Sequence, residues 1–117
     1  MKPVRIAVPT NDGVNIFSKM LGMAKRYFIY ETEDGKDFSL VEKRVNTYEN
    51  TLQHLKTLDV YKLIDDCSII ISARIGKKGI ARLQARGMKL FFRKGDIKAA
   101  LNDIKESLAV KPSPGNE

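Results

Sequence analysis

Cysteine, histidine and tryptophan are almost or wholly missing from this sequence. Its 117 residues include one cysteine, one histidine and no tryptophan. A single cysteine excludes an intramolecular disulfide and a Cys-x-x-Cys metal motif. The N-terminal residues also lack the pattern of a secretory signal peptide. Both absences favour a reducing compartment, and we expect the protein to be cytoplasmic.

Long apolar runs are missing as well. None of the hydrophobic stretches approaches the length that a membrane-spanning helix needs, so we expect no membrane partner. The chain is long enough to bury one core, which we assign to a single domain over residues 1–110. Residues 111–117 (KPSPGNE) are polar and contain two prolines, which predicts a disordered tail.

Acidic residues are in the minority. The sequence has 21 Lys and Arg against 14 Asp and Glu, a formal net charge of +7. Such an excess is typical of a protein with an anionic partner, and equally of a small domain whose charges only keep it soluble. The total alone therefore names no partner.

Three segments in the first half have the composition of β-strands. They are residues 4–8, 26–31 and 38–45, and Asp34-Gly35 between the last two is a hairpin signal. Pro9 cannot donate to a β-ladder, so we expect the first strand to end before it. Residues 15–25 fit neither period and predict a loop with a possible helical turn.

The second half alternates helices and strands. We expect a helix over residues 51–66, a buried strand in 67–72, a helix over 79–86 that ends at Gly87, a strand over 88–92, and a last helix capped by Asp96. A hairpin meander followed by crossover units predicts an α/β fold. The simplest arrangement is a mixed five-stranded sheet of order 3-2-1-4-5 with helices on its faces, the ribonuclease-H-like motif.

The stretch SARIGKKGIARL, residues 72–83, carries the clearest site signal. It leads from an apolar strand through glycine into a helix, where backbone N–H groups and the helix dipole favour an anion. Ligands of parallel α/β units also collect at the carboxyl ends of the strands. We therefore predict an anion site at Arg74, Gly76, Lys77, Lys78 and Gly79. Alternatively, the glycines serve only the turn and the cations are solvated.

Soft or metal-ligating side chains are few. Met20 and Met23 are spaced i, i+3 and could converge as thioethers, although such methionines often fill gaps in a core. His54 is the only imidazole and lies at the rim of an apolar helical stripe, so it is either a metal ligand or a surface group. Cys67 heads a buried strand and is either a ligand or a small core residue. We expect the loops 9–13, 18–25 and 74–79 to share one basic pocket.

Catalysis finds no support in the sequence. Nucleases of the ribonuclease-H-like fold need converging carboxylates, one of them within the first strand, and VRIAV has none. Ser72 has no histidine near it in sequence that could act as its base. We predict a protein that is not an enzyme.

Four stretches in sequence order carry a resemblance. They are IAVPTNDG, GMAKRYFIYE, DDCSIIISARIGKKGIARLQARGMKLF and GDIKAAL. Together they resemble the dinitrogenase iron-molybdenum cofactor biosynthesis family, the NifX-like and NafY-like domains, up to about Leu108. The resemblance implies the ribonuclease-H-like fold and, in the context of nitrogen fixation, a carrier of iron-sulfur or iron-molybdenum clusters or their precursors.

One motif departs from the family pattern. The family has a histidine-phenylalanine-glycine triplet before the second strand, and that histidine is implicated in cofactor binding. Here the triplet reads Met20-Leu21-Gly22, followed by Met23. A thioether is a softer and weaker ligand than imidazole. The resemblance thus adds Met20, Gly22 and Met23 to the residues of the Gly76 loop as candidate cofactor-binding residues.

Two function hypotheses remain open. The first is a non-catalytic carrier of an anionic metal cluster, with cofactor-assembly proteins as partners and with His54 or Cys67 as possible metal ligands. The second is a module that has lost cofactor binding and docks nucleic acid or an acidic protein, and it uses a basic face formed by Arg74, Lys77, Lys78, Arg82, Arg86 and Lys89. The aromatic residues fall mainly in predicted strands, which disfavours base stacking. We favour the carrier.

Overall fold

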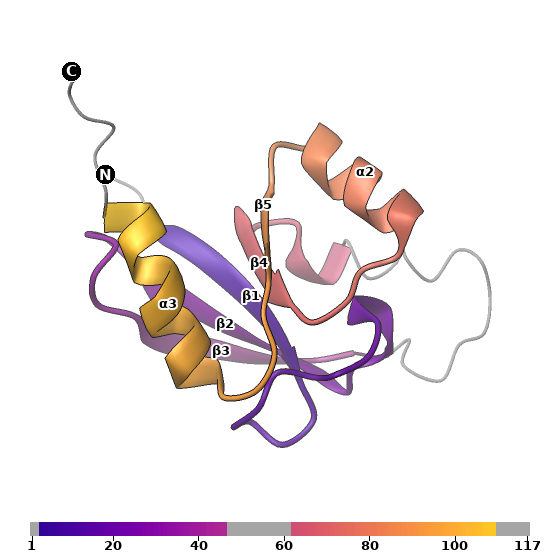
Figure 1. Ribbon diagram of the computed structural model, residues 1–117, viewed down its shortest axis with the longest axis horizontal. Coiled ribbons are helices and arrows are strands. Elements are labelled where there is room, and N and C mark those ends of the chain that lie inside the picture. Colours follow the sequence, from indigo (N-terminus) through magenta and orange to yellow (C-terminus); the bar gives the residue numbers. More distant parts are fainter. Residues whose placement is uncertain (1–2, 47–61, 110–117) are drawn as a thin grey trace.

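Five strands form one mixed sheet in the part of the chain that the computed structural model describes, residues 3–46 and 62–109 (Figure 1). Its order is β3-β2-β1-β4-β5, which confirms the predicted fold class. The central strand β1 pairs antiparallel with β2 and parallel with β4, and β4 pairs parallel with β5. The strands are β1 (Val4–Thr10), β2 (Arg26–Thr32), β3 (Ser39–Val45), β4 (Ile69–Ser72) and β5 (Lys89–Phe92).

The helices alternate with the later strands of the chain. A 3₁₀ turn η1 (Leu21–Met23) interrupts the β1–β2 loop, α2 (Lys77–Ala85) joins β4 to β5, and α3 (Ile97–Ala109) follows β5. Residues 62–64 are helical, but the rest of the helix predicted from residue 51 and the predicted tail fall outside the described residues. No helix in residues 3–46 or 62–109 is long and apolar enough to cross a membrane.

Helical residues pack on both faces of the sheet. On one face, Leu83 of α2 joins Ala7, Tyr27 and Ile70 in a buried cluster. On the other face, Ile97, Ala100, Leu101 and Ile104 of α3 pack on the remaining alternate residues of β1 and β4, namely Ile6, Val8, Ile69 and Ile71. β1 and β4 are therefore buried on both sides, as their nearly continuous apolar sequences predict.

The two later helices end or begin as their sequences indicate. Gly87 follows α2 with a φ of 83°, and its N–H donates to the Gln84 carbonyl at 2.9 Å. This is the left-handed terminating position that glycine favours. At the start of α3, a carboxylate oxygen of Asp96 accepts from the Ala99 N–H at 2.8 Å, which confirms the predicted N-cap.

The predicted boundaries of β1, β4 and α2 are wrong. β4 begins at Ile69, two residues after Cys67. β1 continues through Pro9, which is paired with Tyr27 of β2. Proline is tolerated there because the pairing of β1 with β4 covers only Ile6 and Ala7, so Pro9 lies near an end of the ladder. α2 begins at Lys77, two residues earlier than predicted. The lysine pair therefore belongs to the first helical turn and not to the preceding loop.

Candidate anion-binding site

The β1–β2 loop and the β4–α2 loop lie side by side at the carboxyl edge of the sheet (Figure 1). The Leu21 N–H donates to the Arg74 carbonyl at 2.9 Å, and Met20 and Arg74 form an isolated parallel bridge. The Met20 methyl carbon is 3.7 Å from the point that a Cβ on Gly76 would occupy. The structure thus brings together the methionine segment and the glycine-lysine segment.

Gly76 has no conformational need to be glycine. Its φ of −62° and ψ of 154° suit any L-residue, and a Cβ there would make only an ordinary contact with Met20. The turn therefore does not by itself explain this glycine. What the missing side chain does provide is open access to the backbone at the start of α2.

The first turn of α2 is uncapped and positively charged. Gly76 supplies no capping side chain, and the first turn has no acidic residue. In the described part of the chain, the N–H groups of Lys77 and Lys78 meet no acceptor, and both side chains are exposed. Unpaired N–H groups, the positive end of the helix dipole and two cations all favour an anion at this place.

Buried polar contacts hold the methionine segment in place. The Asn46 side-chain amide donates to the carbonyl oxygens of Gly22 and Ala24 at 3.0 and 2.8 Å. The Tyr27 hydroxyl donates to the Leu21 carbonyl at 2.7 Å, and burial raises the pKa of this phenol. Sequence patterns gave no signal for Asn46, because its role depends on β3 ending beside this loop. These contacts leave Met20 and Met23 at the surface, 41% and 43% exposed.

The turn after β1 is closed by its own carboxylate. Asp12 accepts hydrogen bonds from the backbone N–H groups of Asn15 and Val14, both at 2.8 Å, and these bonds lower its pKa to about 2. The Asn11 side-chain oxygen accepts from the Lys25 N–H at 2.8 Å, which ties this turn to the start of β2. The edge is therefore cross-linked, and the Asp12 charge is engaged within its own turn.

Of the two proposed metal ligands, Cys67 does not join this edge. Cys67 lies before β4, at the opposite end of that strand from Arg74, and is buried. Burial raises the pKa of its thiol to about 12, so the thiolate that metals bind is disfavoured. His54 lies outside the described residues. Residues 3–46 and 62–109 hold no group of three or more His, Cys, Asp or Glu that could bind a metal ion.

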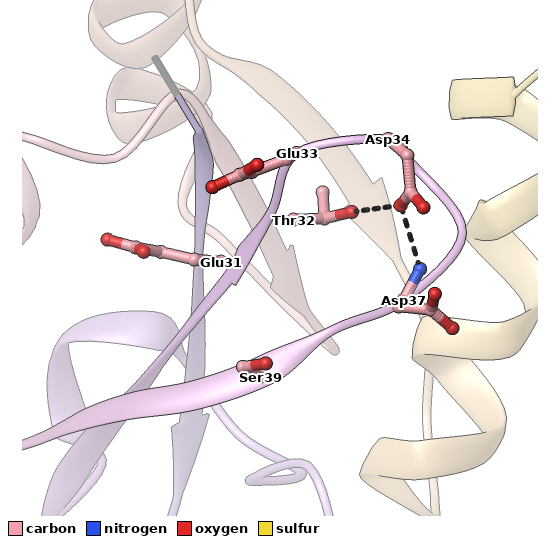
Figure 2. Close-up of a pocket in the computed structure, with 6 residues that line it drawn as sticks. All are labelled: Glu31, Thr32, Glu33, Asp34, Asp37 and Ser39. Atoms are coloured by element: carbon pink, nitrogen blue, oxygen red, sulfur yellow. Dashed lines mark hydrogen bonds between the residues drawn. The ribbon is translucent and has the colours of Figure 1, made fainter. Parts of the chain in front are cut away.

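The β2–β3 hairpin, at the amino edge of the sheet, carries several acidic side chains. A hollow of about 490 Å³ at the β2–β3 hairpin is lined by Glu31, Glu33, Asp34 and Asp37, with Thr32 and Ser39 (Figure 2). Asp34 in it accepts from the Thr32 hydroxyl and from the Asp37 N–H, so it serves the turn. The acidic side chains of this hollow disfavour an anion there.

An ion-pair network lies on the α2 face near the amino edge. Asp66 accepts from Arg44 at 2.7 Å and from Arg5 at 2.5 Å, and these arginines also pair with Glu42 and Glu31. The hydrogen bonds from Arg44 and then Arg5 hold the pKa of Asp66 well below its usual range. The positive charges of Arg5 and Arg44 are therefore neutralised by carboxylates, in contrast to those of the α2 lysines.

The predicted basic face divides in two. Arg74, Lys77, Lys78 and Arg82 are exposed near or on α2. Leu90 packs in the cluster under α2 and Phe91 packs under α3. Because side chains alternate along a strand, Lys89 points to the α3 side and is separated from the others. The continuous surface that the sequence suggested is therefore smaller than expected.

Solved structures with the same fold share little sequence with this chain. The crystal structure of PH0822 is similar with a TM-score of 0.72 and 18% identity, and the match covers 97% of this chain and 100% of that one. The apo form of the orange protein from Desulfovibrio gigas gives a TM-score of 0.70 and 19% identity over 89% and 88% of the two chains. A Thermotoga protein proposed to be a NifB protein gives 0.64 and 21% over 96% and 99%. At these identities the likeness shows the fold.

The family comparison covers most of the sequence. No curated protein matches the chain. The family model described as dinitrogenase iron-molybdenum cofactor matches residues 2–107. The resemblance noted in the four sequence stretches is thereby confirmed, and the chain belongs to the dinitrogenase iron-molybdenum cofactor family.

Proposed function

We propose that this protein binds and carries an anionic metal cluster of the iron-sulfur or iron-molybdenum type, or a precursor of one, at the carboxyl edge of its sheet. Membership of the family supports a role in the biosynthesis or binding of the iron-molybdenum cofactor. The observation that carries the site is the open, uncapped start of α2 beside the exposed methionines.

The chemistry of the edge suits a negatively charged cargo held by few bonds. Backbone N–H groups of Lys77 and Lys78 and the side chain of Arg74 can offer hydrogen bonds and charge to cluster sulfides. The Met20 and Met23 thioethers are soft, weak ligands that suit soft metals. Loose retention of this kind is what a carrier needs, because the cargo must leave again. We propose no catalytic step.

The proposed site lacks the histidine of the family pattern. Met20 stands where the family has histidine and forms the isolated bridge with Arg74, so a thioether takes the place of an imidazole at the proposed site. Because a thioether bears no charge and binds metals weakly, most of the retention falls to the cations and the N–H groups. Binding should therefore weaken as ionic strength rises.

Substitution of Gly76 tests the site without unfolding the protein. Gly76→Asp supplies the absent N-cap and so favours α2, while its carboxylate occupies the N–H groups and repels an anion. Gly76→Asn is the matched control that adds a similar side chain without the charge. The three proteins are reconstituted anaerobically with iron and sulfide and compared by visible spectrum and metal content.

The expected result is a coloured wild-type protein, partial loss of bound iron in Gly76→Asn, and loss of about tenfold or more in Gly76→Asp, in proportion to the added charge. Thermal denaturation should show that both variants remain folded. Equal loading of all three proteins would contradict a site at the start of α2. A wild-type protein that stays colourless and metal-free would contradict the proposed function itself.

A further inference from the structure

The outer face of α2 carries charge of one sign only. Lys77, Lys78 and Arg82 are exposed, and the helix sequence KKGIARLQA contains no acidic residue. None of these three cations forms an ion pair within the described residues. The outer face of α2 therefore presents positive charge that no carboxylate of the described chain neutralises.

This arrangement opposes the stability of the helix. Cations in a first turn face the positive end of the helix dipole. Lys78 and Arg82 are spaced i, i+4, so they also repel each other along the helix surface. Local folding would favour an acidic residue at position 78, whereas Arg82 lies in the last turn, where the dipole favours a cation. Sequence choices that work against local stability are typical of functional surfaces.

Exposed apolar side chains adjoin the charged face. Met20 and Met23 lie beside the Arg74–Gly76 segment that leads into α2. Methionines with charged residues around them match the apolar centre and polar rim of a protein interface, and their flexible side chains adapt to a partner. Neither residues 20–23 nor α2 contributes an aromatic ring on which a nucleic-acid base could stack.

We propose that Lys77, Lys78 and Arg82 of α2, together with Met20 and Met23, form a docking surface for an acidic protein with which the cargo is exchanged. The proposal rests on the proposed function, because the same surface surrounds the Gly76 opening. A partner with carboxylates around an exposed apolar group would neutralise α2 and cover the methionines. Binding of this partner would bring its own cargo site next to the proposed site at Gly76.

The test uses Lys78→Glu in the full chain. Lys98→Glu is the matched control, because Lys98 is likewise the second residue of its helix, but on the opposite face of the sheet. Three labelled probes are titrated by fluorescence anisotropy at several salt concentrations: a short peptide of glutamates around leucines, a polyglutamate of equal charge, and a duplex DNA of equal charge. Cluster loading of the same proteins is measured in parallel.

We expect the glutamate-leucine peptide to bind best, to lose about tenfold in affinity with Lys78→Glu, and to lose less than about twofold with Lys98→Glu. Equal losses in the two variants would show that only net charge matters and would overturn the proposal. Tighter binding of DNA with the same dependence on Lys78 would overturn it in favour of nucleic acid. A wild-type chain that binds the peptide at α2 but takes up no cluster would support the docking surface and refute the carrier function.

Discussion

Replacing Lys78 by glutamate should stabilise the protein. Lys78 is the second residue of α2, a helix with no side-chain cap and no acid in its first turn. A cation there is repelled by the helix dipole, and it is repelled again by Arg82 one turn later. Glutamate reverses both interactions, since it is attracted by the dipole and pairs with Arg82 in the favourable i, i+4 order.

The size of the gain follows from these two terms. A charge in a first turn contributes about 0.3–1 kcal/mol, and exchanging lysine for glutamate removes the unfavourable interaction and adds the favourable one. An i, i+4 pair adds about 0.2–0.5 kcal/mol. Because the side chains are exposed and screened, we take the lower values and expect a gain of about 1 kcal/mol, or a melting temperature about 4 °C higher for a chain of this length.

Urea and thermal denaturation followed by circular dichroism measure this gain. It should shrink as salt is added, because both terms are electrostatic. Lys98→Glu is the control: it makes the same charge change in the first turn of α3, but position 102 is Asn, so it should gain only the dipole contribution, about 0.6 kcal/mol, and no new ion pair. A Lys78→Glu protein that is no more stable than the wild type at low salt would show that the positive charge does not destabilise α2. It would also refute the argument that this face is kept for a partner.

Three further predictions follow from the described contacts. Asp66→Asn should lower the free energy of unfolding at neutral pH by about 1–2 kcal/mol, a value discounted because the carboxylate is 39% exposed. Since the pKa of Asp66 is lowered in the fold, the wild type should lose this advantage as the pH falls below about 4. A variant with the same pH profile as the wild type would refute the role of the ion-pair network. Cys67 should react with a thiol reagent near pH 8 only after denaturation, because burial raises its pKa to about 12, so rapid labelling of the folded chain would contradict its burial. Gly13→Ala should cost about 1–2 kcal/mol in urea denaturation because φ is +79° and the added carbon would lie 3.0 Å from the Phe28 ring, and full stability would argue against this turn geometry.

Local signals in the sequence were enough to predict the strand order. The apolar run at residues 69–71, the Asp34-Gly35 turn and Gly87 each act over a few residues, and each occurs in the structure as expected. Hairpins and right-handed crossovers then leave few sheets to choose from. The proximity of the methionine and glycine-lysine loops follows from that topology, because both emerge at the same edge.

Contacts between distant residues could not be predicted in the same way. Asp66 meets Arg5 across 61 residues, and this pairing depends on the register of three strands. β3 also shifts register by a bulge opposite Ile29 and Tyr30, which changes the faces to which its side chains point. Asn46 gave no pattern at all, although it anchors the loop that contains Gly22. Such contacts arise from the assembled fold.

The sequence prediction misplaced the start of α2. It began the helix at Gly79, although two lysines precede it, and lysines in a first turn are unfavourable. The structure begins the helix at Lys77. The error thus coincides with the place where local stability is given up, which is where a functional surface is expected.

The most direct test of the central claim is an anaerobic titration of the ¹⁵N-labelled protein with tetrathiomolybdate, a diamagnetic molybdenum-sulfur anion, followed by amide NMR. Saturable shifts should concentrate at Met20–Ala24 and Arg74–Gly79 and should be lost in Gly76→Asp. Shifts centred on Cys67 or on the hairpin at Asp34, or no saturable shifts at all, would contradict an anion site at the carboxyl edge.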